Sequence, residues 1–152
     1  MGSIPSAGSG QFFQFAQGVQ IVKLFSFGKD GGPESKVWGF WLIEWKWLFS
    51  IALLRFDHGT RDAYHSHAFN SISWLLWGRL QEYDLSAKPD QPMTRTYKPS
   101  IWPILTYRST YHQVGSYGTS WVITFRGPWA KTWQECSESG EQTLTYGRKV
   151  VR

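Results

Sequence analysis

The chain has 152 residues, a length typical of one domain that buries a hydrophobic core of its own. Its single cysteine, Cys136, excludes an intrachain disulfide, and an aromatic content of 18% with ten tryptophans excludes an intrinsically disordered chain. The 16 Lys and Arg residues against 11 Asp and Glu residues give a net charge of +5, which suits an anionic partner. These positive residues are scattered along the chain, so a dedicated nucleic-acid-binding protein is not indicated.

Membrane and signal segments are not indicated either. The most apolar stretch runs from Val37 to Leu54, and Glu44 and Lys46 near its middle argue against a membrane span. Residues 1–10 are rich in Gly and Ser and lack the basic start of a secretory signal, so they predict a flexible tail that adds little stability. We therefore expect one domain over residues 11–152 in a cytoplasmic protein, because thiols stay reduced in that compartment.

Short apolar segments separated by turn residues follow one another along the chain. Trp41, Ile43 and Trp45 alternate with Leu42 and Glu44, and this period of two indicates a strand rather than a helix. We expect strands at 41–47, 51–56, 71–77, 94–97, 101–105 and 120–125, after further apolar runs between residues 11 and 28. No long stretch shows a capped amphipathic helix, so the sequence predicts an all-β sandwich or barrel.

The four histidines include one informative pair, His65-Ser66-His67. On an extended segment residues i and i+2 project from the same face, so both imidazoles can reach one metal ion. A third ligand must come from elsewhere in the chain, and His112 is the candidate. Neutral imidazoles bind zinc, iron, copper and nickel alike. The alternative is that these histidines only pack inside a barrel, while His58, in a turn, is expected to be an exposed bystander.

The same alternation, continued from the histidine pair, predicts which face of the next strand is buried. Trp74 and Leu76 are expected to point outward. The residues expected to face the interior are His65, His67, Phe69, Ser71, Ser73 and Leu75.

The spacing around the histidine pair resembles the first sequence motif of the cupin superfamily. Gly59, His65, His67, Ser71 and Gly78 stand at the positions of that motif, although the family usually has Glu where this chain has Ser71. A carboxylate ligand of the usual site is therefore missing. The resemblance implies instead a three-histidine site of the type that the thiol dioxygenases use.

A wider resemblance covers residues 41–134 and is to small phage and bacterial cupins. The segment 61–71 resembles their Arg- and His-containing motif, Arg108 and His112 match a later Arg-x-x-x-His, and Val122 to Pro128 match a strand that ends in Gly-Pro. The resemblance implies a single-domain cupin, a small antiparallel β-barrel or jelly roll, in which the strand of His112 lies across the barrel from the His65–His67 pair and brings His112 within reach of it. It also implies a divalent transition metal at the three histidines, and it does not distinguish iron, nickel, manganese, copper and zinc.

Candidate substrate-binding residues surround the expected metal site. Three neutral imidazoles leave a divalent ion its full positive charge, which favours a small anionic ligand such as a carboxylate or a thiolate. Arg61, Arg108 and Arg126 are candidates because a guanidinium group pairs bidentately with a carboxylate or phosphate. Ser71 has the parity of the histidine pair and is expected to face the same cavity. Glu82 is expected to be a solvated strand residue rather than a fourth ligand.

Three functions follow from this reading, and the sequence identifies no catalytic residue beyond the metal ligands. The first is a metal-dependent, oxygenase-type enzyme that acts on a small anionic substrate. The second is a non-catalytic phage structural or accessory protein that uses the barrel as a packing module, as a homo-oligomer or with a virion partner, in the host cytoplasm or the virion. The third is a sugar- or nucleotide-binding module. Fold alone cannot separate them, because function depends on the site.

Overall fold

The structure is a computed structural model that describes residues 11–13, 22–60, 64–86, 88, 90–137, 140–145 and 149–151. Every regular element in these ranges is a β-strand, so the all-β expectation is confirmed. Within the same ranges no helix is long and apolar enough to cross a membrane. The tail predicted at residues 1–10 and the candidate Arg61 lie outside the described residues.

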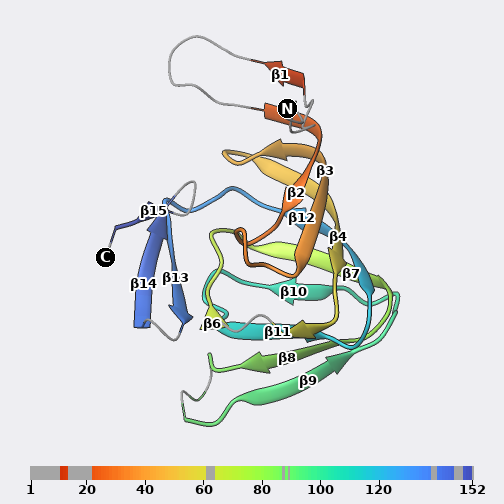
Figure 1. Cartoon of the computed structure of the whole chain (residues 1–152), viewed down its shortest axis with the longest axis vertical. Coiled ribbons are helices and arrows are strands. Elements are labelled where there is room, and N and C mark those ends of the chain that lie inside the picture. The colour runs from red at the N-terminus through yellow and green to blue at the C-terminus, as the bar shows by residue number, and fades with distance from the viewer. Residues whose placement is uncertain are drawn as a thin grey trace, which may run out of the picture.

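The first sheet is antiparallel throughout and has the strand order β1-β2-β3-β4-β12-β7-β10 (Figure 1). Its strands are β1 (Gln11–Phe13), β2 (Val22–Lys29), β3 (Val37–Trp45), β4 (Phe49–Phe56), β12 (Ser120–Arg126), β7 (Ser71–Trp77) and β10 (Ile104–Thr106). Strands β4 and β12 lie side by side at its centre although they are far apart in the sequence.

The second sheet has the order β15-β14-β13-β6-β11-β8-β9, and β5 also pairs with β11. Its strands are β5 (Gly59–Thr60), β6 (Tyr64–His65), β8 (Leu80–Asp84), β9 (Met93–Tyr97), β11 (His112–Ser116), β13 (Thr132–Ser137), β14 (Gly140–Thr145) and β15 (Lys149–Val150). Side chains from both sheets line one internal cavity, so the two sheets form a jelly-roll barrel.

The strands agree with the sequence prediction where the chain is apolar. The predicted strands at 51–56, 71–77, 94–97 and 120–125 appear with bounds that differ by at most two residues. The predicted strand at 101–105 is wrong in its first half, because Pro103 has no N–H to donate and pairing begins at Ile104. Strands β8, β11, β13 and β14 were not predicted, since their mixed polar sequences show no apolar run.

Inside the barrel, strands β4, β12 and β7 place their inward side chains in three cross-strand rows. The rows are Leu54–Val122–Leu75, Ala52–Thr124–Ser73 and Ser50–Arg126–Ser71. Along the strands the first row is apolar, the second contains hydroxyl groups and the third contains the charged Arg126. In the second row the Ser73 hydroxyl donates to Thr124 Oγ1 over 2.9 Å. The interior therefore has an apolar end and a polar end.

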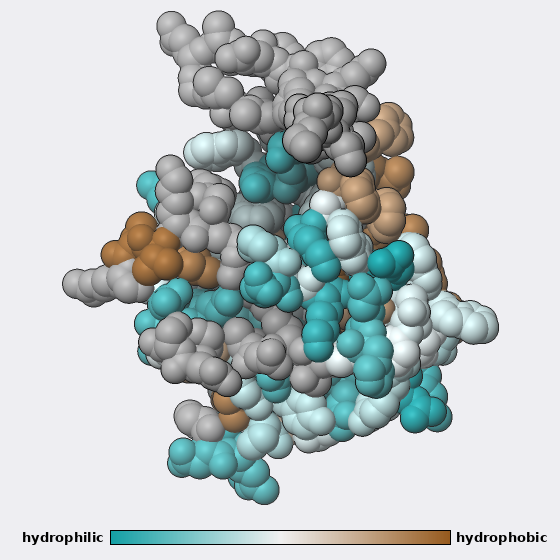
Figure 2. Space-filling view, viewed as in Figure 1, coloured by the Kyte–Doolittle hydropathy of each residue, from teal (hydrophilic) through white to brown (hydrophobic). Residues whose placement is uncertain are grey.

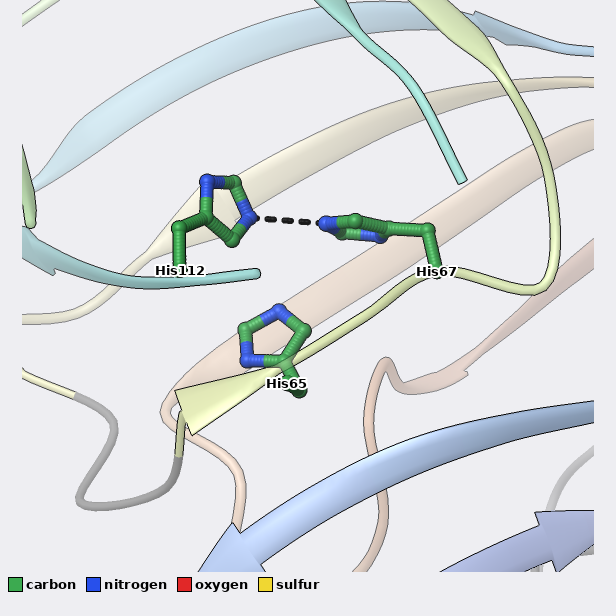
Figure 3. A group of neighbouring side chains, drawn as sticks. All are labelled: His65, His67 and His112. Atoms are coloured by element: carbon green, nitrogen blue, oxygen red, sulfur yellow. Dashed lines mark hydrogen bonds between the residues drawn. The ribbon is translucent and has the colours of Figure 1, made fainter. Parts of the chain in front are cut away.

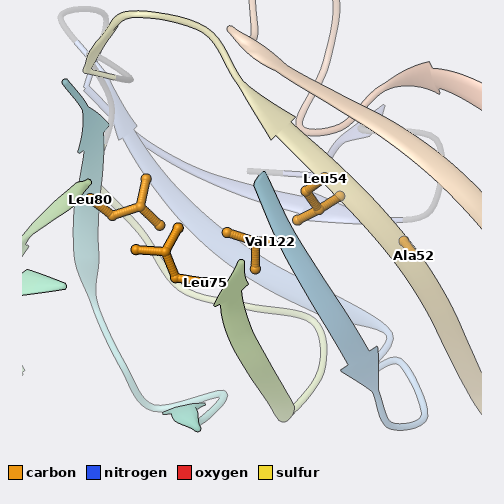
Figure 4. Packing of buried hydrophobic residues seen from close by; sticks show 5 residues of the cluster. All are labelled: Ala52, Leu54, Leu75, Leu80 and Val122. Atoms are coloured by element: carbon orange, nitrogen blue, oxygen red, sulfur yellow. The ribbon is translucent and has the colours of Figure 1, made fainter. Parts of the chain in front are cut away.

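The apolar end is the hydrophobic core of the barrel (Figure 4). Its fully packed members are Ala52, Leu54, Leu75, Leu80 and Val122, each at most 6% exposed. Burying each of the larger of these side chains stabilises the fold by about 1.5–3 kcal/mol. Leu80 comes from β8 and the others from the first sheet, so this cluster holds the two sheets together.

The interior parity predicted from the histidine pair is confirmed. Leu75 is buried in the core, whereas the Trp74 indole donates to the Ile101 carbonyl on the outside and Leu76 is 52% exposed. His65, His67, Phe69, Ser71 and Ser73 line the internal cavity. A register shift opposite Trp121 and Val122 then leaves Trp77 exposed as well.

Strand β3 contains a bulge that brings a carboxylate into the barrel. The register with β4 shifts between Trp41 and Ile43, so Leu42 is exposed and Glu44 turns inward. Glu44 is buried, and Lys23 and Lys46 pair with it at 3.5 Å and 3.6 Å. The alternation of tryptophans in the sequence thus identified a strand but not the break in its pattern.

Gly78 connects β7 to β8 with a positive φ of 95°. A Cβ at this position would lie 2.7 Å from both Ser120 Cα and the Thr119 carbonyl oxygen, where backbone leaves no room. We expect Gly78→Ala to lower the free energy of unfolding by about 2–4 kcal/mol, through backbone strain and overpacking. For a domain of this size the melting temperature should fall by about 5–15 °C in a thermal unfolding experiment.

Gly118→Ala is the matched control for this prediction. Gly118 also has a positive φ, 74°, but a Cβ there would meet nothing within 4 Å. The Gly118→Ala substitution should therefore lower the free energy of unfolding by about 1 kcal/mol, through backbone strain alone. Equal losses in the two variants would contradict the steric role assigned to Gly78.

Candidate metal centre

Three histidine rings meet at the polar end of the barrel (Figure 3). The centroids of the His65, His67 and His112 rings are 4.8–5.1 Å apart, and one nitrogen from each ring lies within 4.8 Å of the other two. Nε2 of His67 faces Nε2 of His112 at 2.7 Å. The predicted convergence of these three residues is confirmed.

The position of His112 differs from the sequence expectation. We expected its strand to lie across the barrel from the His65–His67 pair, but β11 is the direct neighbour of β6 and His112 is the cross-strand partner of His65. Directly opposite residues in an antiparallel pair have Cβ atoms about 4.5–5.5 Å apart. The close approach of these two rings therefore follows from strand register.

His67 lies just beyond the end of β6, on a segment held by neighbouring backbone. The Ser66 N–H donates to the Gln134 carbonyl over 2.9 Å, and the Ala130 N–H donates to the Ala68 carbonyl. These bonds keep the chain extended although no regular strand continues there, so His65 and His67 still project from one face (Figure 3).

A buried carboxylate orients the third histidine. Nδ1–H of His112 donates to Oε1 of Glu82, and the Tyr97 hydroxyl donates to Oε2 of the same carboxylate over 2.5 Å. Arg95 pairs with Glu82 at 3.3 Å. Because its Nδ1 carries the proton, His112 presents the lone pair of Nε2 to the cavity, which is the tautomer that a metal ligand requires.

The electrostatics of the site keep the carboxylate charged and His67 neutral. Burial alone raises the pKa of Glu82, but hydrogen bonds from His112 and Tyr97, with the nearby charges of His112 and Arg95, outweigh burial and lower that pKa to about 2. Burial and the bond to Glu82 raise the pKa of Tyr97 to about 12. Burial, then repulsion from His65, His112 and Arg126, holds the pKa of His67 well below its usual 6.5.

The donor set fits a divalent transition metal. Two ring nitrogens that face each other at 2.7 Å, as those of His67 and His112 do, need a proton or a cation between them. Metal–nitrogen bonds of about 2.0–2.1 Å space neighbouring ligand nitrogens about 3–3.5 Å apart. The nitrogens of His67 and His112 lie closer together than this, at 2.7 Å, and all three ligand nitrogens lie within 4.8 Å of one another, so binding of an ion requires the rings to reorient. Three neutral imidazoles, one braced by a carboxylate, match the usual design of such sites.

The histidines open into a cavity of about 530 Å³, a volume typical of small-molecule sites. Besides the histidines it is lined by aromatic side chains, including Phe69, Trp129 and Trp133, and by Ser and Thr hydroxyls. Arg126 also lines the wall, where its guanidinium group lies over the Phe69 ring, 4.6 Å from the centroid. This guanidinium is buried and pairs with both carboxylate oxygens of Asp30 at 3.2 Å and 2.6 Å.

The candidate substrate-binding residues have different positions. Ser71 lines the cavity as its parity predicted. Arg108 is exposed and is not among the cavity-lining residues; its side chain donates to the Pro128 carbonyl and its N–H to Asn70 Oδ1, so it secures a surface turn. Arg61 lies outside the described residues. His58 is exposed, as expected, and accepts the Gly118 N–H.

Glu82 was expected to be a solvated strand residue, and this prediction is wrong. It is 4% exposed and contacts His112 directly. A signal was present, because Glu82 has the strand parity of Leu80 in β8, and an inward Leu80 makes Glu82 inward too. The Asp30 and Glu44 carboxylates near the cavity had no comparable local signal.

The fold and the site together define a jelly-roll barrel with a three-histidine cluster facing an internal cavity. Among solved structures, the chain is similar to a putative ethanolamine utilization protein from Salmonella typhimurium, with a TM-score of 0.54 and 13% identity over 80% of this chain and 96% of that one. It is also similar to an RmlC-like cupin from Shewanella frigidimarina, with a TM-score of 0.50 and 13% identity over 66% of this chain and 81% of that one.

A cupin domain from Schizosaccharomyces pombe matches with a TM-score of 0.50 and 11% identity, over 62% of this chain and 66% of that one. No protein-family model matches the sequence, and comparison with curated proteins finds no match. This likeness shows the fold alone: the described part of the chain has the jelly-roll barrel of the cupin structures.

Proposed function

We propose that this chain is a metal-dependent enzyme in which His65, His67 and His112 hold a divalent transition metal that acts on a small anionic molecule, in an oxygenase-type reaction. The observation that carries the proposal is the convergence of three imidazole nitrogens on one point of a cavity large enough for a substrate. A purely structural metal site is normally closed by four protein ligands. Three histidines beside open space leave positions for a ligand, and a bound metal there supplies Lewis acidity or redox chemistry.

The charges of the cavity support an anionic ligand bound at the metal itself. The Arg126 guanidinium is neutralised by Asp30, and Lys23 and Lys46 share Glu44. Arg95 lies between Glu82 and Asp84 and pairs with both. These paired groups carry no net charge, so the charge of the ion dominates the field at the histidines. A carboxylate or thiolate is the ligand that this field favours.

Ser71 and the pair of Ser73 and Thr124 give the opposite wall of the cavity its hydrogen-bonding groups. These hydroxyls can orient a polar substituent, while Phe69 and Trp129 pack against its apolar part. The wall therefore suits an anion with a short polar or apolar body.

Metal analysis followed by ligand binding tests the proposal. The full chain purified without chelators should contain close to one iron, nickel, manganese, copper or zinc ion per chain by elemental analysis, or accept one Co²⁺ after stripping. A panel of small carboxylates and thiols, added to the Co²⁺ form, should include at least one that changes its visible spectrum at millimolar concentration. The same compound should raise dioxygen uptake by the Fe²⁺ form.

Two results would count against the proposal in different ways. A chain that binds no divalent ion at micromolar concentration has no metal centre. A chain that binds one ion but whose spectrum responds to none of the anions has a closed, structural metal, which favours the non-catalytic packing module.

A further inference from the structure

Much of the outer face of the first sheet is apolar. Antiparallel sheets usually bury one face and expose the other, with polar side chains on the exposed one. Here two complete cross-strand rows of apolar side chains run across the outside. The rows are Phe27–Phe40–Leu53–Ile123–Trp74 and Leu24–Ile43–Ile51–Phe125–Ile72–Leu105. We call these two rows, with the exposed apolar residues beside them on the same strands (Leu42, Phe49, Leu76 and Trp77), the outer apolar face.

Aromatic side chains of neighbouring strands contact one another across this face. Phe27 lies 5.2 Å from Phe40, Phe40 stacks on Trp121 at 6.0 Å, and Trp74 meets Phe125 edge to face at 5.9 Å. Neither row contains a charged residue. Figure 2 shows one margin of the face in brown at the upper right, beside β2 and β3.

The exposed area of the face exceeds what a monomer normally leaves in water. Nine large apolar residues on the strands of this sheet are 36–70% exposed: Phe27, Phe40, Leu42, Phe49, Ile72, Leu76, Trp77, Leu105 and Phe125. At about 150–250 Å² for each side chain, these nine leave about 650–1,100 Å² uncovered. The largest apolar patch of an ordinary monomer is about 300–600 Å². A stable interface buries about 800 Å² on each partner.

We propose that the outer apolar face is the interface of a homodimer, in which the first sheets of two copies pack face to face around a two-fold axis. The area of the face matches one side of such an interface, and two apolar rows without a charged residue can pack against the same rows of a second copy. The proposal is independent of the metal site, which lies inside the barrel.

The charges around the face are compatible with a second copy. Two cations lie in the next outward row, Lys29–Trp38–Arg55–Trp121–Trp77, with their charges 4.3 Å and 6.0 Å from the Trp38 ring centroid. Arg55 pairs with Asp57 at 3.2 Å. Sheets that pack face to face keep their strands within about 30° of alignment, which places the two-fold axis close to parallel or perpendicular to the strands. An axis perpendicular to the strands places this row against the opposite end of the second copy, so like charges do not meet there.

Sedimentation velocity of the full chain tests the proposal directly. We expect a particle of about 35 kDa, twice the mass of the 17.6 kDa chain, at concentrations of about 10 µM and above. Phe125→Glu places a charge at the centre of the face, where Phe125 is 42% exposed in the isolated chain and makes no core contact with the apolar end of the barrel. It should raise the dimer dissociation constant at least about 100-fold.

Val150→Glu is the matched control, because Val150 is 55% exposed but lies on β15 of the other sheet. It should leave the dimer intact. Ile72→Asn, at the cross-strand neighbour of Phe125, provides a second variant if Phe125→Glu does not fold. Retained circular dichroism and Co²⁺ binding identify the folded variants.

Three results would overturn the proposal. The wild-type chain could sediment as a monomer at 100 µM. A dimer could form but resist a folded variant of the face, so that the contact lies elsewhere. A monomer could instead bind vesicles of phosphatidylcholine and phosphatidylglycerol in a manner that Phe125→Glu abolishes, which would make the face a lipid-binding surface.

Discussion

Replacing His67 by alanine is expected to abolish stoichiometric binding of divalent metal. His67 contributes one of three nitrogens at the site, and the two that remain, from His65 and His112, make a poor chelate. The loss can be measured as the thermal stabilisation that metal gives. An ion at about 100 times its dissociation constant adds about 2.7 kcal/mol to the free energy of unfolding of the wild type. That gain, about 5–10 °C in melting temperature, should disappear in the variant.

The matched control for this prediction is His58→Ala. His58 is exposed and its only described bond is from the Gly118 N–H, so the variant should keep the full metal-induced stabilisation. Both variants must be compared with their own metal-free forms, because removing a half-buried ring changes stability by itself. An unchanged affinity in His67→Ala would place the metal elsewhere in the chain.

The part of the site that the sequence predicts is the part that short-range spacing determines. His65 and His67 share a face because strand geometry has a period of two, and this holds even where β6 ends at His65. The same period correctly placed Ser71, Ser73 and Leu75 inside the barrel. These inferences need only the local direction of the backbone.

The remainder of the site depends on long-range register, which spacing does not contain. The approach of His112 to His65 results from the pairing of β11 with β6, which brings together two residues 47 positions apart in the sequence. We expected the two strands on opposite sides of the barrel, and no local pattern corrects that error. For Glu82 the local parity with Leu80 indicates an inward side chain, but its partners His112 and Tyr97 come from the neighbouring strands β11 and β9, whose register the sequence does not give.

Charged residues were the least predictable part. Arg108 and Arg126 look alike in the sequence, yet Arg108 secures a surface turn while Arg126 is buried against Asp30. Asp30 itself lies in the segment 29–33, Lys-Asp-Gly-Gly-Pro, whose composition predicts a turn and nothing about burial. The fold could be predicted as all-β from its apolar strands. Strands β13 and β14 were not predicted, because their polar sequences lack the alternation of apolar and polar residues on which the prediction rests.

Glu82→Gln is the second variant with a large expected effect, and it separates the carboxylate from the imidazoles. The amide keeps the shape of the side chain and can still accept a bond from His112 Nδ1–H, but it removes the negative charge that makes this ring a stronger ligand. We expect metal affinity to fall about 10–100-fold, the usual loss when the carboxylate partner of a metal-binding histidine is removed. Isothermal titration with Zn²⁺ at pH 7 measures it.

Glu44→Gln is the matched control, since Glu44 is an equally buried carboxylate of the cavity that pairs with Lys23 and Lys46 and contacts none of the three histidines in the described hydrogen bonds and ion pairs. Its metal affinity should change by less than about threefold. Equal losses in the two variants would mean that the total charge of the cavity, rather than the bond to His112, sets the affinity.

The acid stability of the metal-free protein provides an independent readout of Glu82. Its pKa lies at about 2 in the folded chain and near its ordinary 4.5 in the unfolded chain, so the charged carboxylate stabilises the fold fully above pH 4.5. That contribution is lost as the pH falls from about 4.5 toward 2. Glu82→Gln removes it at every pH, and the variant should therefore lose less stability than the wild type over this interval in urea titrations. Parallel losses in both proteins would show that the Glu82 carboxylate is not held in its charged form by His112 and Tyr97.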